Sequence, residues 1–168
     1  MGDTKNLVNT DAIEKIRELA KDANICHFVT KLSDTPLSSR PMATQKVDDD
    51  GNIWFLSNKD SDKNMDIQAD QRVQLFYSSH SSYEYLSIYG TAEIIFDKEK
   101  IHEMWTSFAK AWFPGGENDP AASLIKVIPE DGYYWDTKSN KIVSLFKIAK
   151  SIVTGNTDDN GIEGTLKV

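Results

Sequence analysis

The hydrophobic pattern near the start of the chain predicts a helix. Apolar residues recur at helical spacing over positions 13–23. They are Ile13, Ile16, Leu19, Ala20 and Ala23. Asn9 or Thr10 is a suitable N-terminal cap, because either side chain can accept a hydrogen bond from a free backbone N–H. We expect this helix to cover one side of the core.

From Ile25 onward the pattern changes to short apolar runs rich in β-branched and aromatic residues, which are typical of strands. The predicted strands are 25–30, 42–47, 53–57, 73–78, 86–96, 123–128 and 132–135. Residues 48–52, Asp-Asp-Asp-Gly-Asn, predict a hairpin turn, because Gly, Asn and Asp tolerate the positive φ of tight turns. The sheet is therefore expected to be at least partly antiparallel.

Two further helices are predicted at 61–69 and 97–112, and Pro114-Gly115-Gly116 ends the second. Trp105, Phe108 and Trp112 are expected to pack in the core along one face of that helix. Residues 136–140 form a predicted turn, and 142–148 fit either a strand or a helix. The polar tail from 154 is expected to be mobile or held only by docking.

About five to seven short strands, mostly joined by hairpins and interrupted by two or three helices, fit a barrel better than a βαβ sheet. The expected fold class is therefore α+β, a mostly antiparallel β-barrel with two or three flanking helices. With 168 residues the chain is expected to form one domain, with a core over about 10–150 and a polar tail over 154–168.

Composition narrows the classes of function. The net charge of -7 repels nucleic acid and anionic membranes at long range, so we expect no nucleic-acid and no membrane partner. Any anionic ligand must then be held by a local basic site. Cys26 is the only cysteine, which excludes an intramolecular disulfide, and we expect it to be a small buried apolar residue. Without a signal-peptide pattern or an apolar run long enough for a membrane span, we expect a cytoplasmic protein.

The first candidate for chemistry is Arg40. Pro41, at the head of a predicted strand, holds Arg40 extended just before the sheet. An arginine fixed in this way can direct two donors onto a phosphate. An exposed arginine at a strand end is the simpler alternative.

The second candidate is the segment 55–64, in which a strand ends in polar residues and turns into a helix. Helix N-termini bind anions through free N–H groups and the helix dipole. Lys63 falls in the first turn, where a cation is disfavoured unless a negative group lies nearby. A bound phosphate would supply that group, and Asp60 or Asp62 could equally do so.

These segments follow one another in a familiar order: 40–45, 54–57, 61–63, 72–75 and 86–93. In this order they resemble the FMN-binding split barrel of the pyridoxamine 5′-phosphate oxidase superfamily. Segments 112–116, 119–120 and 134–136 resemble its general stress protein branch. The resemblance covers roughly residues 10–148.

The resemblance implies a flavin site, with FMN as the cofactor and FAD as an alternative. Arg40 and Lys63 would hold the phosphate, with Ser57 hydrogen-bonding beside it. Met42, Ala43 and Thr44 would lie along the flavin, and Phe55 and Leu56 would line the ring pocket. Tyr85 falls where the oxidases carry a glutamine, and Trp135 where an aromatic residue approaches the flavin from the partner subunit. A homodimer with the site at its interface is implied.

Two departures from the oxidases limit what the resemblance implies. Asp62 stands where a second phosphate-binding basic residue is common, and no Arg/His segment for a substrate phosphate follows Trp135. The sequence therefore does not predict pyridoxamine-phosphate oxidation. Three hypotheses remain: a flavin-dependent oxidoreductase of unknown substrate, a non-catalytic protein that stores or senses flavin, and a barrel that takes another phosphate- or haem-bearing ligand.

Overall fold

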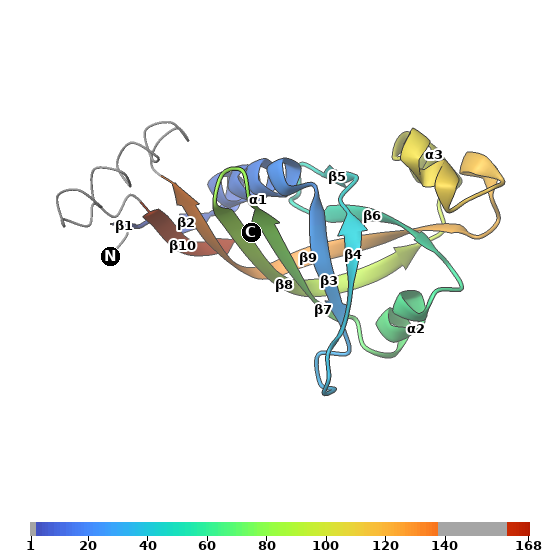
Figure 1. Ribbon diagram of the computed structural model, residues 1–168, viewed down its shortest axis with the longest axis horizontal. Coiled ribbons are helices and arrows are strands. Elements are labelled where there is room, and N and C mark those ends of the chain that lie inside the picture. The colour runs from blue at the N-terminus through green and yellow to red at the C-terminus, as the bar shows by residue number, and fades with distance from the viewer. Residues whose placement is uncertain (1–2, 138–160) are drawn as a thin grey trace.

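The computed structural model describes residues 3–137 and 161–168. The helices are α1 (Asn9–Ala23), α2 (Asp62–Ala69) and α3 (Lys98–Glu103), with 3-10 turns η1 (Ser107–Ala111) and η2 (Gly116–Asn118). The strands are β1 (Asp3–Thr4), β2 (Leu7–Val8), β3 (Ile25–Thr30), β4 (Ser38–Ala43), β5 (Lys46–Val47), β6 (Ile53–Asn58), β7 (Arg72–Ser79), β8 (Glu84–Ile95), β9 (Ala122–Thr137) and β10 (Gly161–Lys167). Helix α1 packs at one end of the sheet, whereas α2 and α3 lie toward the other end (Figure 1).

The strands of the described segments form one mixed sheet of ten strands in the order β1-β10-β9-β8-β7-β3-β4, and β6 branches off β9. Strand β10 runs parallel to β1 and β2, and the other pairs are antiparallel. The α+β class is confirmed. Within these residues no pairing joins β4 to β6, so the sheet is open and the expected barrel is not confirmed.

The first helix spans the predicted residues and buries Ala12, Ile16, Leu19 and Ala20 against the sheet. Its predicted cap was wrong. Val8 is the capping residue, and no side chain caps the helix. Asn9 already belongs to the helix, with a positive φ of 50°.

The predicted strand over 42–47 is divided into β4 and β5. Strand β4 begins earlier, at Ser38, because it pairs along the whole of β3. The chain then changes partner, since the Thr44 N–H donates to Asn24 and the Gln45 N–H donates to Trp54 on β6. The hairpin at 48–52 is confirmed, because β5 and β6 pair antiparallel. The two predicted strands 123–128 and 132–135 form one continuous strand, β9, with a register shift opposite Gly90.

The predicted long helix over 97–112 was also wrong. Asp97 caps the short helix α3, which ends at Glu103 and gives way to a 3-10 turn. Phe108 and Trp112 are 82% and 69% exposed, so the expectation that they pack in the core fails, whereas Phe113 is only 4% exposed. Because the helix ends at Glu103 and a 3-10 turn follows, Ala109 and Phe113 are the residues that become buried. They join a second hydrophobic cluster with Trp54, Ile101, Met104, Ala122 and Leu124.

Strand β10, near the end of the sequence, is hydrogen-bonded into the same sheet as the other strands. Strand β10 lies between β9 and the N-terminal strands, and the Lys5 N–H donates to the Glu163 carbonyl at 2.8 Å. At Gly164 a Cβ would lie 2.1 Å from the Lys5 carbonyl oxygen, so this crossing requires glycine. Positions 138–140 of the predicted turn and the element predicted at 142–148 lie outside the described residues. Among the helices of the described segments, none is long and apolar enough to cross a membrane.

Candidate functional site

Arg40 projects toward the inner face of the sheet. Its register partner on β3 is Phe28, which is fully buried, and paired residues share a face. The guanidinium donates to Thr30 Oγ1 at 2.8 Å and to Ser38 Oγ at 2.6 Å. The position of Arg40 is therefore fixed by the strand and by two hydroxyl groups, rather than left free in solvent.

Lys63 enters the same region from the first turn of α2. Its ammonium donates to Ser61 Oγ at 3.1 Å, and no carboxylate forms an ion pair with it among the described residues. Burial lowers the pKa of Lys63, and the positive charge of Arg40 lowers it further, against an opposing effect of Asp62. Two cations thus lie close enough to repel each other at a helix N-terminus.

Asp66 is the buried counter-charge of this region. It is only 5% exposed and accepts a hydrogen bond from Thr30 Oγ1 at 2.7 Å. Its carboxylate lies 3.0 Å from Lys31 Nζ and 3.5 Å from Arg40 Nη2. Burial raises the pKa of Asp66, but the hydrogen bonds from Thr30 and Lys31 and the charges of Lys31 and Arg40 outweigh it and leave the pKa lowered.

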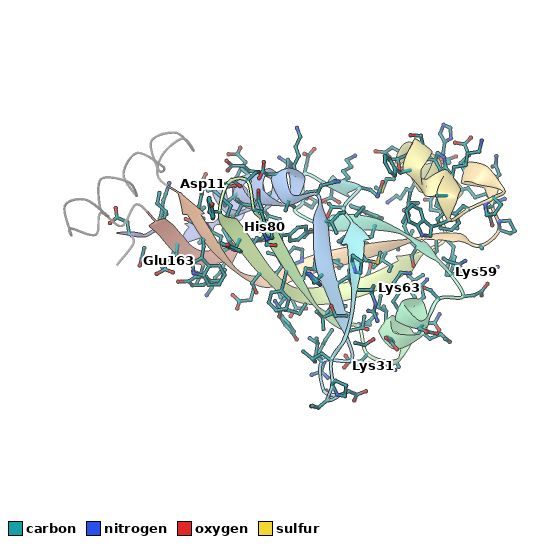
Figure 2. The ribbon with its side chains drawn as sticks, in the orientation of Figure 1. Asp11, Lys31, Lys59, Lys63, His80 and Glu163 are labelled. Carbon is teal, nitrogen blue, oxygen red and sulfur yellow. The ribbon has the colours of Figure 1, made fainter. Side chains whose placement is uncertain are left out.

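We call Arg40, Lys63, Lys31 and Asp66, with the N-terminal turn of α2, the cationic cradle. Two of these cations, Lys31 and Arg40, lie within 3.5 Å of the buried Asp66 carboxylate. Figure 2 shows Lys31 and Lys63 at the end of the sheet where α2 lies. The backbone N–H groups of Asp62 and Lys63 donate to no carbonyl within the described segments, as is usual in a first helical turn. The cradle therefore combines charge with free donors, which suits an anion.

Ser57 lies beside the cradle in a buried polar network. Its hydroxyl donates to Asn64 Oδ1 at 2.6 Å, and Asn64 in turn donates to Ser123 Oγ at 3.1 Å. Ser123 donates back to the Ser57 carbonyl at 2.9 Å. The network ties α2 to β6 and β9, so it fixes the helix end that carries Lys63.

The other predicted residues near the cradle occupy different surroundings. Met42 is buried, Ala43 is exposed, and the Thr44 hydroxyl lies 2.7 Å from the Tyr77 hydroxyl. Phe55 is fully buried and packs edge-to-face on Phe28. Leu56 faces the second hydrophobic cluster instead. The Phe55 side chain is thus a core residue of this chain, and roles for Phe55 and Leu56 in a ring pocket stay predictions.

Tyr85 and Trp135 lie in a separate place. They face each other across β8 and β9, and both are partly exposed on the outer face of the sheet. From β4 to β8 the sheet order counts three strand spacings, roughly 14 Å along the sheet. The structure therefore divides the predicted site residues into an inner cationic group and an outer aromatic pair.

The outer pair belongs to an aromatic groove with a volume of about 680 Å³. We use this name for the cavity lined by His27, Phe76, Tyr83, Tyr85, Trp135 and Asp136, among others. His27 and Phe76 are paired across β3 and β7 and point outward. The alternation of inward and outward side chains along β3 and β7 could have predicted that His27 and Phe76 share the outer face. The position of Asp66 three residues after Lys63 in α2 could have predicted a carboxylate on the same side of this helix. Tyr83 lies in a turn and gave no such signal.

These features define a class of protein: an α+β fold with a cationic cradle at a helix N-terminus and an aromatic groove on the outer face of its sheet. Residues 11–159 match the family model described as pyridoxamine 5′-phosphate oxidase like. The chain belongs to this family.

Several known proteins are similar to the chain. A crystal structure of general stress protein 26 from Jannaschia sp. CCS1 has a TM-score of 0.79 and 30% identity, over 95% of this chain and 99% of that one. The structure of a general stress FMN/FAD binding protein from Xanthomonas citri has a TM-score of 0.64 over 77% of this chain and 90% of that one; at 24% identity it shows the fold alone. Protein bli-3 of Neurospora crassa is 26% identical over 128 residues, which are 71% of this chain but only 61% of that protein's length.

Proposed function

We propose that this chain binds FMN and holds the cofactor's phosphate in the cationic cradle. The observation that carries the proposal is that two cations meet at α2: Arg40 lies 3.5 Å from Asp66 of this helix, and Lys63 stands in its first turn without a carboxylate in ion-pair contact among the described residues. Burial and, after it, repulsion by Arg40 lower the pKa of Lys63. A phosphate between them would replace this repulsion with two charge-assisted hydrogen bonds. FAD, which also carries phosphate, is the alternative cofactor.

The residues present fit such a group. Asp66 compensates part of the local charge, but its carboxylate already accepts from the Thr30 hydroxyl and pairs with the Lys31 ammonium. Lys63 has only the Ser61 hydroxyl as a polar partner within the described segments. Arg40 and Lys63 would bind the phosphate, and the free N–H groups of α2 would orient it. When bound, the flavin would supply electron transfer, for which no side-chain base is required.

We propose further that the protein is a homodimer in which the aromatic groove of one copy faces the flavin of the other. The separation of Arg40 from Tyr85 and Trp135 along the sheet supports this arrangement, since one chain presents the two groups on different faces. Ile25, Phe76, Tyr85 and Trp135 are all partly exposed on the outer face. A second copy would remove this apolar surface from water.

We propose that the whole chain is one domain whose sheet closes as a split barrel. Residues 44 and 45 pass directly from the pairing with β3 to the pairing with β6, which brings the two open edges together. The fold shared with the FMN/FAD binding protein of Xanthomonas citri is consistent with this proposal.

The test of flavin binding is a visible absorption spectrum, taken before and after FMN is added and the protein is passed through a desalting column. A retained two-band flavin spectrum supports the proposal, and a colourless protein overturns it. Arg40→Ala should weaken FMN binding about 10- to 150-fold, since a hydrogen bond to a charged group contributes about 1.5–3 kcal/mol. An unchanged affinity would mean that the cradle does not hold the phosphate.

We propose a flavin-dependent oxidoreductase as the activity of the loaded protein. The alternative is a protein that binds flavin without turnover. A chemical reductant followed by an electron acceptor separates the two, because only the oxidoreductase reoxidises faster than free FMN under the same conditions.

A further inference from the structure

One hydroxyl group joins two strands and the helix of the cationic cradle. Thr30 is the last residue of β3 and is fully buried. Its Oγ1 donates to Asp66 Oδ2 on α2 at 2.7 Å and accepts from Arg40 Nη1 on β4 at 2.8 Å. Because a hydroxyl has only one proton, the proton given to the carboxylate leaves the oxygen lone pairs for the guanidinium. The direction of both hydrogen bonds is therefore fixed.

The same carboxylate closes a ring with Arg40. Asp66 Oδ2 lies 3.5 Å from Arg40 Nη2, so both terminal nitrogens of the guanidinium face the pair formed by Thr30 and Asp66. In addition, Ser38 Oγ accepts from Nη2 at 2.6 Å, and the Phe28 carbonyl accepts from Nη1 at 3.4 Å. A guanidinium has five N–H groups, and these three hydrogen bonds leave at least two of them for a ligand. The ring thus orients the guanidinium without using all of its donors.

Asp66 also lies on the helix that carries Lys63. Positions three residues apart share one side of a helix, so Asp66 relates the first turn of α2 to Arg40 on β4. Its other oxygen, Oδ1, lies 3.0 Å from Lys31 Nζ, so both carboxylate oxygens have partners. Asp66 is only 5% exposed, and a carboxylate at this depth stays charged only while such partners are in place. The placement of Arg40 relative to Lys63 therefore depends on Thr30 and Asp66.

We infer that Thr30 and Asp66 form a positioning pair for the phosphate: they hold Arg40 where one phosphate can contact both this guanidinium and the Lys63 ammonium. The inference rests on the proposed function, because it assigns a role at the same site. Neither side chain needs to touch the ligand, so both are positioning residues rather than catalytic ones. A purely structural role would lower the melting temperature and leave the preference for phosphate unchanged. A positioning role weakens the binding of a phosphate-bearing flavin selectively.

The first variant is Thr30→Val, which removes the hydroxyl, nearly preserves the shape of the side chain and leaves the charge of the cradle unchanged. An altered affinity then reports the position of Arg40 rather than the local charge. We expect the Kd for FMN to rise about tenfold, the lower end of the loss expected for Arg40→Ala. The Kd for riboflavin, which lacks the phosphate, should stay the same. Thr30→Ser keeps the hydroxyl and should restore FMN binding.

Ser82→Ala is the matched control variant. Like Thr30, Ser82 is buried with its hydroxyl beside a carboxylate, here 2.8 Å from Asp22 Oδ2, but it lies in the turn between β7 and β8. Ser82→Ala should leave the Kd for FMN unchanged even where it lowers the melting temperature. Asp66→Glu is the second probe, because it keeps the charge and lengthens the side chain by one methylene group. We expect it to weaken FMN binding selectively, as Thr30→Val does.

Two results would overturn the inference. The first is a ratio of FMN to riboflavin affinity in Thr30→Val equal to that of the parent protein. The second is equal weakening of both flavins, as a general loss of structure would cause. If Thr30→Val shows no thermal unfolding transition and is therefore not folded, Asp66→Glu decides between the same outcomes. A parent protein that retains no FMN overturns the proposed function instead, and this result is known before any variant is compared.

Discussion

Replacing Lys63 by glutamine should weaken FMN binding while leaving the flavin-free protein as stable as the parent, or more stable. Lys63 is half-buried, has no carboxylate in ion-pair contact within the described residues, and lies near the charge of Arg40. Its pKa is lowered, so the folded chain holds this proton less firmly than the unfolded chain does. This unfavourable effect on stability is fully present below the folded pKa, where both states carry the proton, and it fades as the pH rises through the unfolded value.

The two effects differ in size and sign. Loss of a charge-assisted hydrogen bond to phosphate costs about 1.5–3 kcal/mol, which raises the Kd for FMN about 10- to 150-fold. Solvent screens the repulsion between Lys63 and Arg40, so removing it stabilises the flavin-free chain by about 1 kcal/mol or less. For a chain of this length that corresponds to a rise in Tm of up to about 4 °C.

Quenching of flavin fluorescence gives the affinity, and calorimetry of the flavin-free protein gives the Tm. Riboflavin, which lacks the phosphate, is the control ligand, and its affinity should not change. Lys59→Gln is the matched control variant, because Lys59 is exposed on the same segment and Figure 2 shows it away from Lys63. Equal weakening of riboflavin and FMN, or a clear fall in Tm for Lys63→Gln alone, would refute the reasoning.

Three further predictions concern the core and the buried charges. Asp66→Asn should lower the free energy of unfolding by about 1–3 kcal/mol at pH 7, since it removes the charge that binds Lys31 and Arg40. Because the pKa of Asp66 is lowered, the stabilisation by its charge is present above about pH 4 and is lost as the pH falls through the folded value. Urea titrations at pH 7 and well below about pH 4 should show that the difference in unfolding free energy between the parent and Asp66→Asn shrinks in acid. Burial raises the pKa of the Cys26 thiol to about 12, so a thiol reagent at pH 8 should label it only after unfolding, and rapid labelling of the native protein would contradict this. Phe113→Ala should cost about 3–5 kcal/mol in urea unfolding and the neighbouring Phe108→Ala close to nothing; equal costs would mean that the two rings share one environment.

The sequence was sufficient for elements with a strong local period. Helix α1, strand β3 and the β5–β6 hairpin follow from residue spacing and turn chemistry, which act over a few neighbouring residues. The cradle was partly accessible in the same way, because Pro41 and the polar end of β6 mark where Arg40 and Lys63 must lie. The resemblance to the oxidase family then joined two local signals that the pattern alone left separate.

Errors arose where long-range packing overrides the local period. The pattern at 97–112 suits a helix, but the structure ends α3 at Glu103 and buries Phe113 rather than Phe108. The polar end of the chain gave no strand signal, because β10 forms by pairing with β9 and with the N-terminal strands, which are distant in sequence, and by burying Leu166 in the core.

The sequence by itself determined the α+β class, the main strands and two cations of the cradle, Arg40 and Lys63, because local spacing and residue type indicate them. Only the tertiary structure decided that Asp66 binds Arg40, that Tyr85 and Trp135 lie away from the cradle, and that Tyr83 lines the aromatic groove. Each of these depends on which strands become neighbours. That choice is made by burial of the whole sheet rather than by any short segment.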